Sequence, residues 1–306
     1  MLVLIVLAIV VNSIIVPEFF SYYNLIGSTT YAVEIGLLSL GQMLVIISGG
    51  GAIDLSVGSM VSFASIIFGL AVTDGHLNVW LAAVVTVLFG LLMGSVNGFL
   101  VAKMGFSALI VTLATLYAYS AIPLVLTNTK PISNLPQSLL FLTSSVKGIP
   151  MQTLIVYIPV ILILAFLLMR TVIGRHLYGV GTNATAAKFA LTPVQWTRFW
   201  AFAASGLLAG MAAVVTTSRF ASARPDAGVG LELQSITVAV LGGVAITGGV
   251  GGVVGVVLAT LLIALVDNGL ILANVQSTYQ VGALGFILIG SALLNEFAGR
   301  RSRRRA

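Results

Sequence analysis

The sequence predicts an all-α polytopic membrane protein, and three observations lead to this fold class. The 306-residue chain is 59% hydrophobic and only 7% charged, whereas an ordinary soluble domain is about 25% charged. Apolar stretches recur from end to end, and about 20 such residues span a bilayer as a helix. These stretches do not alternate apolar and polar residues, as the strands of a membrane barrel would. Together with the absence of cysteine, this excludes a soluble enzyme, a disordered chain and a disulfide-stapled secreted domain.

We expect about ten transmembrane helices in one membrane domain that covers residues 1–306. In the first, residues 2–17, the 15 residues before Pro17 form about 22 Å of helix, which is short for a hydrocarbon core of about 30 Å. No basic residue precedes it, so it lacks the charged start of a signal peptide, and we expect the native N-terminus to be longer. The other expected spans are residues 31–48, 56–73, 79–101, 107–127, 153–169, 199–217, 236–247, 253–272 and 281–297.

The stretch from Ile236 to Leu272 is the least regular part of this pattern. Its 37 residues form about 55 Å of helix, slightly less than two full spans and a turn require. A single span there would place the arginine-rich C-terminus opposite the basic loop 170–198. Seven glycines between Gly242 and Gly255 can break a helix. We therefore expect two short or broken helices.

The basic residues predict how the spans are oriented. No acidic residue lies between Asp74 and Asp226, whereas nine basic residues do, and five arginines crowd the end of the chain. With a cytoplasmic N-terminus, ten of the fourteen basic residues face the cytoplasm, as the positive-inside rule requires. We expect both termini, including the basic tail 299–306, to be cytoplasmic. No soluble domain carries these charges as one surface, so nucleic acid is excluded as a partner.

A glycine-rich segment, Gly49–Ser59, separates two apolar runs. Its glycines permit a broken helix, and Asp54 can accept hydrogen bonds from the exposed N–H groups that begin the next span. Two interpretations remain open, because Asp54 is either a plain helix cap or part of irregular backbone that lines a cavity.

Two similar hexapeptides indicate an internal repeat. Residues 97–102, Asn-Gly-Phe-Leu-Val-Ala, resemble residues 268–273, Asn-Gly-Leu-Ile-Leu-Ala. They end the fourth and ninth expected spans, which run in opposite directions. An inverted repeat that relates spans 2–5 to spans 7–10 has this property.

The loop 170–198 is long for such a compact chain, and it carries four basic residues and no acid. Asn183 can cap a short alanine-rich helix from Ala184 to Leu191, and Thr192-Pro193 is typical of the cap and first residue of the next helix. The short helix is either a docking element or part of a passive basic loop. We expect the glycine turns 49–53 and 248–252 to be too short and too flexible for docking.

No set of residues indicates catalysis or a metal site. The two histidines, His76 and His176, lie far apart in the sequence, and no G-x-x-x-x-G-K-[ST] pattern indicates nucleotide binding. A mid-membrane acid would indicate ion coupling, and Glu34 lies well within an expected span, near its outer end. Asp54 and Asp267 are expected close to span ends, where the cost of charge is low.

Taken in order, the motifs resemble those of permease subunits of bacterial ATP-binding-cassette importers for sugars, the ribose, galactose, xylose and autoinducer-2 group. The resemblance covers nearly the whole chain, with departures at Ala52, at Thr182 and at 191–193. The residues that carry it are Ile53–Ser59, Asn97-Gly98, Lys103, Gly174-Arg175, Tyr178–Asn183, Ala186-Ala187, Ser222–Pro225, Gly228–Leu233, Val240–Gly243, Gly248-Gly249 and Asn268–Leu270.

The resemblance implies a working assembly in the bacterial inner membrane, surrounded by the lipid bilayer. Two ATP-binding subunits, a second permease subunit (identical or related) and a periplasmic or extracellular binding protein would be the partners. This chain would then need no cofactor, because ATP is bound by partner subunits. An ion-coupled secondary transporter remains the alternative.

The same resemblance assigns roles to particular residues. Asp54, Ser56, Asn97 and Asn268 become candidates for the translocation path. The loop 170–198 becomes the coupling loop to the ATP-binding subunit, through Gly181, Asn183, Ala186, Ala187 and Lys188. The binding protein would dock on a charged patch of an outer loop, formed by Arg219, Arg224, Asp226 and Glu232.

Overall fold

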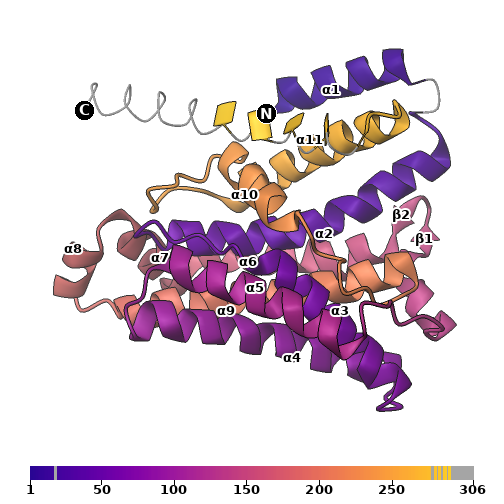
Figure 1. The fold of residues 1–306 in the computed structure, drawn as a ribbon. Helices are drawn as coiled ribbons and strands as arrows, with labels where there is room; N and C mark the ends of the chain where they lie inside the picture. The colour runs from indigo at the N-terminus through magenta and orange to yellow at the C-terminus, as the bar shows by residue number, and fades with distance from the viewer. Residues whose placement is uncertain (17–18, 277–278, 281, 284, 288, 291–306) are drawn as a thin grey trace.

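The computed structural model describes residues 1–16, 19–276, 279–280, 282–283, 285–287 and 289–290, which form a helical protein with one two-stranded sheet (Figure 1). Helices suit these apolar runs because each backbone group is bonded within its own segment, as a lipid environment requires. The α-helices are α1 (Leu2–Ile15), α2 (Tyr22–Ile47), α3 (Val57–Thr73), α4 (Val79–Gly98), α5 (Ala108–Leu126), α6 (Ile158–Arg170), α7 (Val172–Thr182), α8 (Ala184–Phe189), α9 (Val194–Phe220), α10 (Leu231–Leu241) and α11 (Val253–Leu272). The shorter elements are the π-helices η1 (Phe99–Lys103) and η3 (Thr153–Tyr157), the 3-10 helix η2 (Gln137–Thr143) and an antiparallel hairpin of β1 (Ser145–Val146) and β2 (Ile149–Pro150).

Six helices of the described part are long and apolar enough to cross a membrane, so the chain is a polytopic membrane protein. Helices α1, α3 and α10 are also apolar but shorter. The last expected span, residues 281–297, falls largely outside the described residues, and the tail 299–306 falls wholly outside them. The six long spans are Asn24–Ile47, Val79–Lys103, Ala108–Leu126, Thr153–Arg170, Val194–Phe220 and Val253–Leu272.

Several helix boundaries differ from the expected ones. α2 begins at Tyr22 rather than at residue 31, because the Ser21 side chain caps it there. α8 ends at Phe189, two residues before the expected end, since Leu191 adopts a positive φ of 57°. The stretch 236–272 forms two helices as expected, but the first of them ends at Leu241, where the glycines begin.

The long helices run side by side between two ends of the molecule (Figure 1). One end carries α8 and is here named the α8 end, and the opposite end carries β1 and β2 and is named the hairpin end. The central helices α2 and α9 run in opposite directions. Near the hairpin end, Gln152 donates to the carbonyl of Thr30 in α2 (2.9 Å). At the α8 end, Arg198 of α9 donates to the carbonyl of Ser48 (3.4 Å).

Helix contacts recur in pairs across this centre. α4 packs along α9 and α11 packs along α2, while α3 contacts α9 and α4, and α10 contacts α2 and α11. Glycines permit the close approach of α4 and α9, since Gly90 and Gly94 face Gly206 and Gly210. A Cβ on Gly94 would lie 2.9 Å from the backbone of Gly206, so the two backbones meet without side chains between them.

Each central helix is followed by a turn that enters the protein. The Asp54 turn, residues 48–56, leaves α2 at the α8 end through three glycines with positive φ, Gly49–Gly51. The Arg224 turn, residues 221–230, leaves α9 at the hairpin end and runs along α3, where the N–H of Gly228 donates to Ser62 (2.9 Å). The Arg224 turn meets the start of α3, where Gly58 packs on Gly228 with no room for a side chain. α3 therefore begins inside the protein, whereas α10 begins directly after the exposed residues Val229 and Gly230.

Candidate translocation and coupling sites

The Asp54 turn brings three of the expected path residues into one buried cluster. Asp54 Oδ1 accepts the backbone N–H of Ser56 (3.0 Å) and its hydroxyl (2.6 Å). Asn97, near the end of α4, donates to Ser56 Oγ (2.8 Å), and Ser205 of α9 donates to Asp54 Oδ2 (3.4 Å). Asp54, Ser56 and Asn97 are fully buried. This Asp54 cluster is a closed polar site in the conformation described.

A second polar cluster, named the Glu34 cluster, lies between α2, α9, α10 and α11. Glu34 is fully buried and accepts from Nε (2.5 Å) and Nη2 (2.9 Å) of Arg219. Tyr31 donates to Oε1 of Gln234 (3.1 Å), and Gln234 donates from Nε2 to Asp267. Charges inside a membrane protein are costly and face its interior, where they pair with one another. The ion pair joins α2 to α9, and the hydrogen bonds through Gln234 join α2 to α10 and α11.

Asn268, the fourth expected path residue, lies beside the Glu34 cluster and not with Asp54. Its Nδ2 donates to Oδ1 of Asn24 in α2 (2.7 Å), and Nδ2 of Asn24 donates back (3.0 Å). The neighbouring Asp267 keeps one oxygen, Oδ1, with no hydrogen-bond partner among the described residues. The structure thus divides the expected path residues between two clusters.

The structure corrects the expected position of Glu34 and the expected exposure of Asp54 and Asp267. Because α2 extends to Tyr22, Glu34 lies at the middle of this helix rather than near an outer end. Asp54 and Asp267 are buried, at 0% and 5% exposure, although the sequence indicates span ends where charge costs little. Hydrogen bonds offset the cost of burying these carboxylates, from Ser56 and Ser205 to Asp54 and from Gln234 to Asp267.

Helix α8 projects from the molecule at the α8 end (Figure 1). Asn183 caps it as expected, since its Oδ1 accepts the N–H of Ala186 (2.9 Å). Phe189 and Leu191, just beyond, are 86% and 92% exposed. Ala187 is buried against the protein, which corrects the expectation that its small side chain faces a partner. Asn183, Ala186 and Lys188 remain on the exposed side.

Behind α8, three backbone segments meet at glycines, here named the glycine node: Gly49, Gly181 and Gly248-Gly249. The N–H of Gly249 donates to the carbonyl of Ile47 (3.0 Å). A Cβ on Gly49 would lie 2.7 Å from Cα of Gly181, and a Cβ on Gly181 would lie 2.5 Å from N of Gly249. The glycine turns are therefore packed against the end of α7, contrary to the expectation that they are too flexible to take part in coupling.

The four charges expected on one outer patch do not share one exposed surface. Arg219 is bound within the Glu34 cluster, and Glu232 is half-buried in the first turn of α10. Arg224 and Asp226 form an exposed ion pair, with Nη2 and Oδ2 3.0 Å apart. The hydrogen bond from Arg224 holds the pKa of Asp226 below its ordinary value. Of the four charged residues, only Arg224 and Asp226 lie together on an exposed surface.

The helices, the buried polar clusters between them and the projecting α8 define a multi-pass membrane transport component. Residues 24–292 match the family described as branched-chain amino acid transport system / permease component. The chain belongs to this family, and the resemblance to importer permeases is confirmed.

Curated relatives match the chain over nearly its whole length. A probable ABC transporter permease of Sinorhizobium fredii is 36% identical, over 94% of this chain and 85% of the relative. A ribose import permease of Haemophilus influenzae is 33% identical, over 97% and 92%. An autoinducer 2 import system permease of Enterobacter sp. is 34% identical, over 94% and 89%. No solved structure matches the chain.

Proposed function

We propose that the chain is the membrane-spanning subunit of a bacterial ATP-binding-cassette importer that moves a sugar or sugar-like small molecule. Family membership carries the proposal, together with relatives named for ribose and autoinducer 2 import that align over 94% or more of the chain. An extracytoplasmic binding protein delivers the solute, and separate subunits bind and hydrolyse ATP. A second permease subunit completes the pore.

The ATP-binding subunit docks on α8 in this proposal. Phe189 and Leu191 offer large apolar surfaces that the protein itself leaves uncovered, and such surfaces typically mark interaction sites. A hollow of about 800 Å³ between α8 and the start of α9 is lined by Lys188 and Phe189 among others. Asn183, Ala186 and Lys188 would contact the partner, whereas Gly181 and Ala187 would hold α8 against the permease.

Variants of Phe189 test this docking site. Because Phe189 is exposed, Phe189→Asp should leave the permease inserted and abundant but lower solute-stimulated ATP hydrolysis at least tenfold in reconstituted vesicles. Val146→Asp, an exposed apolar position in the hairpin, is the matched control and should keep full stimulation. Normal stimulation in Phe189→Asp would remove α8 from the mechanism.

The glycine node would carry movement of α8 into the membrane. Besides the node itself, Tyr178 of α7 donates to the carbonyl of Gly251 (2.9 Å), and Arg198 binds the carbonyl of Ser48. A displacement of α7 therefore acts on the end of α2 and on the start of α11 together. Contacts between backbones transmit displacement without the slack of rotating side chains.

The translocation path is proposed to follow the central helices between the two clusters. Asp54, Ser56 and Asn97 would lie at one stage of the path and Asn268 at the other. Buried polar groups in membrane proteins mark such pathways, and α3 begins with buried residues beside Asp54. Broken helices form binding sites in other transporter folds. Both stages are closed in the conformation described.

The proposed topology has about ten spans, with the α8 end in the cytoplasm and both termini there. Lys103, Arg170, Arg175, Lys188 and Arg198 lie on elements of the α8 end, where they favour a cytoplasmic position. The paired contacts of α4 with α9 and of α11 with α2 support an inverted repeat of spans 2–5 and 7–10.

Glu34 favours one competing function, an ion-coupled transporter, because it is a buried intramembrane acid. However, Arg219 binds both of its oxygens, which neutralises the charge that an ion would need. Uptake into vesicles distinguishes the two functions. The importer requires its binding protein and ATP on the α8 side, and uptake persists after ionophores collapse the proton and sodium gradients. Uptake that follows an ion gradient without ATP would support the competing function.

A further inference from the structure

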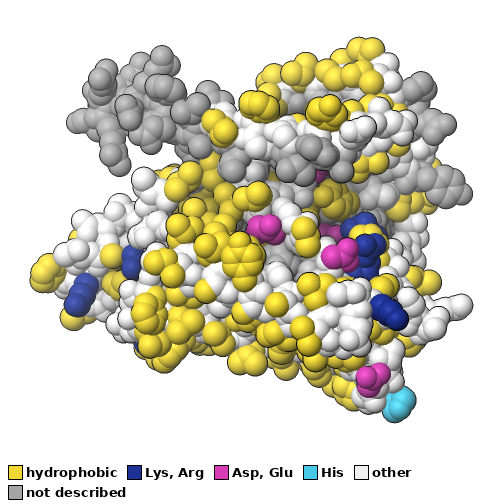
Figure 2. Space-filling view, viewed as in Figure 1, with side chains coloured by type: hydrophobic (Ala, Val, Ile, Leu, Met, Phe, Trp, Pro, Cys, Tyr) yellow, Lys and Arg dark blue, Asp and Glu magenta, His cyan; other side chains and the backbone are white. Residues whose placement is uncertain are grey.

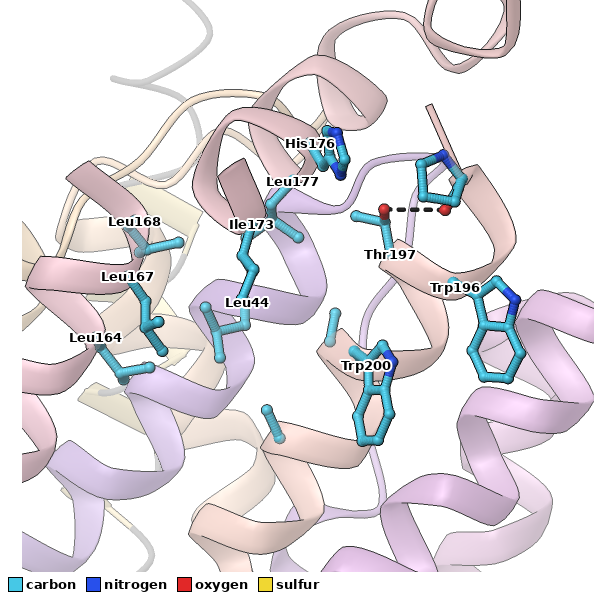
Figure 3. Close-up of a pocket in the computed structure, with 13 residues that line it drawn as sticks. Leu44, Leu164, Leu167, Leu168, Ile173, His176, Leu177, Trp196, Thr197 and Trp200 are labelled. Carbon is cyan, nitrogen blue, oxygen red and sulfur yellow. Dashed lines mark hydrogen bonds between the residues drawn. The ribbon is translucent and has the colours of Figure 1, made fainter. Parts of the chain in front are cut away.

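A crevice of about 500 Å³ opens between α2, α6, α7 and α9 near the α8 end (Figure 3). Leucines of α6, including Leu164 and Leu168, form one wall. Trp196 and Trp200 of α9 stand on the opposite side, and Leu44 of α2 lies between the walls (Figure 3). The volume is in the range of small-molecule pockets, but the lining is almost wholly apolar.

The crevice lies near the ends of two candidate membrane spans. Leu168 is two residues from the end of the span Thr153–Arg170, and Trp200 is in the second turn of the span Val194–Phe220. The side chains of Trp196 and Trp200 are about half exposed. Tryptophan is enriched at the membrane–water interface, because its ring is apolar while its N–H is polar.

One basic residue contacts the lining of the crevice, and two more neighbour lining residues in the sequence. Lys103 Nζ lies 3.5 Å from the ring centre of Trp196. Arg170 ends α6 just after the lining leucines, and Arg175 precedes the lining residue His176 on α7; both arginines are exposed. No acidic residue occurs in the sequence between Asp74 and Asp226, so no acid on α6, α7 or the first turns of α9 opposes these charges.

A second groove, of about 420 Å³, provides an internal comparison. It lies towards the hairpin end between α4, α9 and the η2–η3 region, and its lining, which includes Trp80 and Ala83, is also apolar. Neither lining contains Lys, Arg, Asp or Glu. Bulk lipid can cover either groove, but at the crevice Lys103 contacts a lining residue, Trp196.

We propose that the crevice is a binding site for an anionic phospholipid. One acyl chain occupies the slot, where it removes apolar surface from contact with water and headgroups. The phosphate lies at Lys103, Arg170 and Arg175, because basic pockets between membrane helices bind anionic headgroups. The proposal rests on the membrane-spanning fold and not on the transported solute, so it stands or falls separately from the proposed function.

The three tryptophans of the chain, Trp80, Trp196 and Trp200, make the test direct. Lipids with brominated acyl chains quench tryptophan fluorescence on contact. In Trp80→Phe, all tryptophan fluorescence comes from the crevice, and in Trp196→Phe/Trp200→Phe it all comes from the second groove. The full chain is placed in phosphatidylcholine vesicles and titrated with brominated phosphatidylglycerol or brominated phosphatidylcholine.

At the crevice, we expect half-maximal quenching at no more than one fifth as much brominated phosphatidylglycerol as brominated phosphatidylcholine. At the second groove, the two lipids should quench equally. Replacing Arg170 and Arg175 by glutamine should remove most of the preference for phosphatidylglycerol, while both lipids still quench. Ala204→Phe, which fills the slot, should lower quenching of the crevice tryptophans by either lipid.

Three outcomes would overturn the proposal. Equal quenching by both lipids at the crevice would indicate contact with bulk lipid only. Quenching at the second groove but by neither lipid at the crevice would indicate that protein, such as a second copy of the chain, covers it. Release of brominated phosphatidylglycerol by millimolar inorganic phosphate would indicate an anion site without an acyl chain.

Discussion

The Asp54 turn and the Arg224 turn follow equivalent central helices, yet their surroundings differ. In the first, Asp54 is fully buried and bound by Ser56 and Ser205. In the second, Arg224 and Asp226 bind one another in the open. Figure 2 shows a face of the molecule on which acidic side chains lie in the middle and, beside basic ones, towards the hairpin end, while the tip at α8 carries only basic ones.

The difference shows how one type of turn can serve two faces of a transporter. The Asp54 turn starts at the glycine node, so α7 and α8 can act on it directly. The Arg224 turn instead carries the open charges of the hairpin end, where a soluble partner can reach them. Gly228 of this turn packs on Gly58 in the first turn of α3, just after the Asp54 turn, so the start of α3 connects the two turns.

The ion pair between Glu34 and Arg219 fixes the end of α9, directly before the Arg224 turn. Its removal should have the largest effect on stability. Glu34→Gln leaves the arginine of α9 without its partner, and an unpaired buried charge costs about 3–5 kcal/mol. We expect a much lower unfolding temperature for the purified permease. The double variant Glu34→Gln/Arg219→Gln should recover most of the loss. A single variant as stable as the wild type would mean that this pair does not fix the end of α9.

The start of the Asp54 turn should be nearly as sensitive. Gly49→Val places a side chain against Gly181, whereas Gly51→Val meets open space. Both positions have positive φ, which costs about 1–2 kcal/mol for other residues. The difference between the two variants therefore isolates the contact at the glycine node. We expect uptake to fall more than tenfold further in Gly49→Val, at matched membrane abundance. Equal uptake by the two variants would show that the glycine node takes no part in coupling.

The two aspartates provide a matched pair of neutral substitutions. Asp54→Asn weakens buried, charge-assisted hydrogen bonds and should cost about 1–3 kcal/mol. Asp226→Asn removes half of an exposed ion pair, which is worth at most about 1 kcal/mol. Thermal unfolding of both variants in the same detergent measures the contrast. Equal losses would show that the Asp54 cluster is hydrated rather than closed.

The smallest effect concerns docking of the binding protein at the Arg224 turn. Rim charges mainly steer association, so Arg224→Glu should weaken docking a few-fold at low salt and less at high salt. The charge-swapped variant Arg224→Asp/Asp226→Arg keeps the pair and serves as the control. If Arg224→Glu docks like the wild type at every salt concentration, these residues form a solvated loop that takes no part in docking.

The same pair gives a pH dependence of known sign. The pKa of Asp226 is lowered in the folded protein by Arg224, so the pair contributes fully at neutral pH. This contribution is lost as the pH falls through that lowered value. The salt dependence of docking should therefore persist between pH 5 and pH 8.

The sequence by itself determined the class of protein and most of its helices. Apolar runs of membrane length leave few alternatives in lipid, because every backbone group must be bonded within its own segment. Local signals also located the cap at Asn183 and the break between α10 and α11. The motifs around Asp54, Asn183 and Asn268 were sufficient to indicate the family.

Only the tertiary structure decided which polar groups meet. Glu34 and Arg219 are 185 residues apart, and Asn24 and Asn268 are 244 apart, so no local pattern links them. Gln234 and Tyr31 are polar residues within apolar runs, which is a weak sign of a buried polar site. The sequence prediction of the site did not include them. Spacing along one chain fixes which side chains share a helix face, whereas the cost of a buried charge is set by neighbours that other helices bring to it.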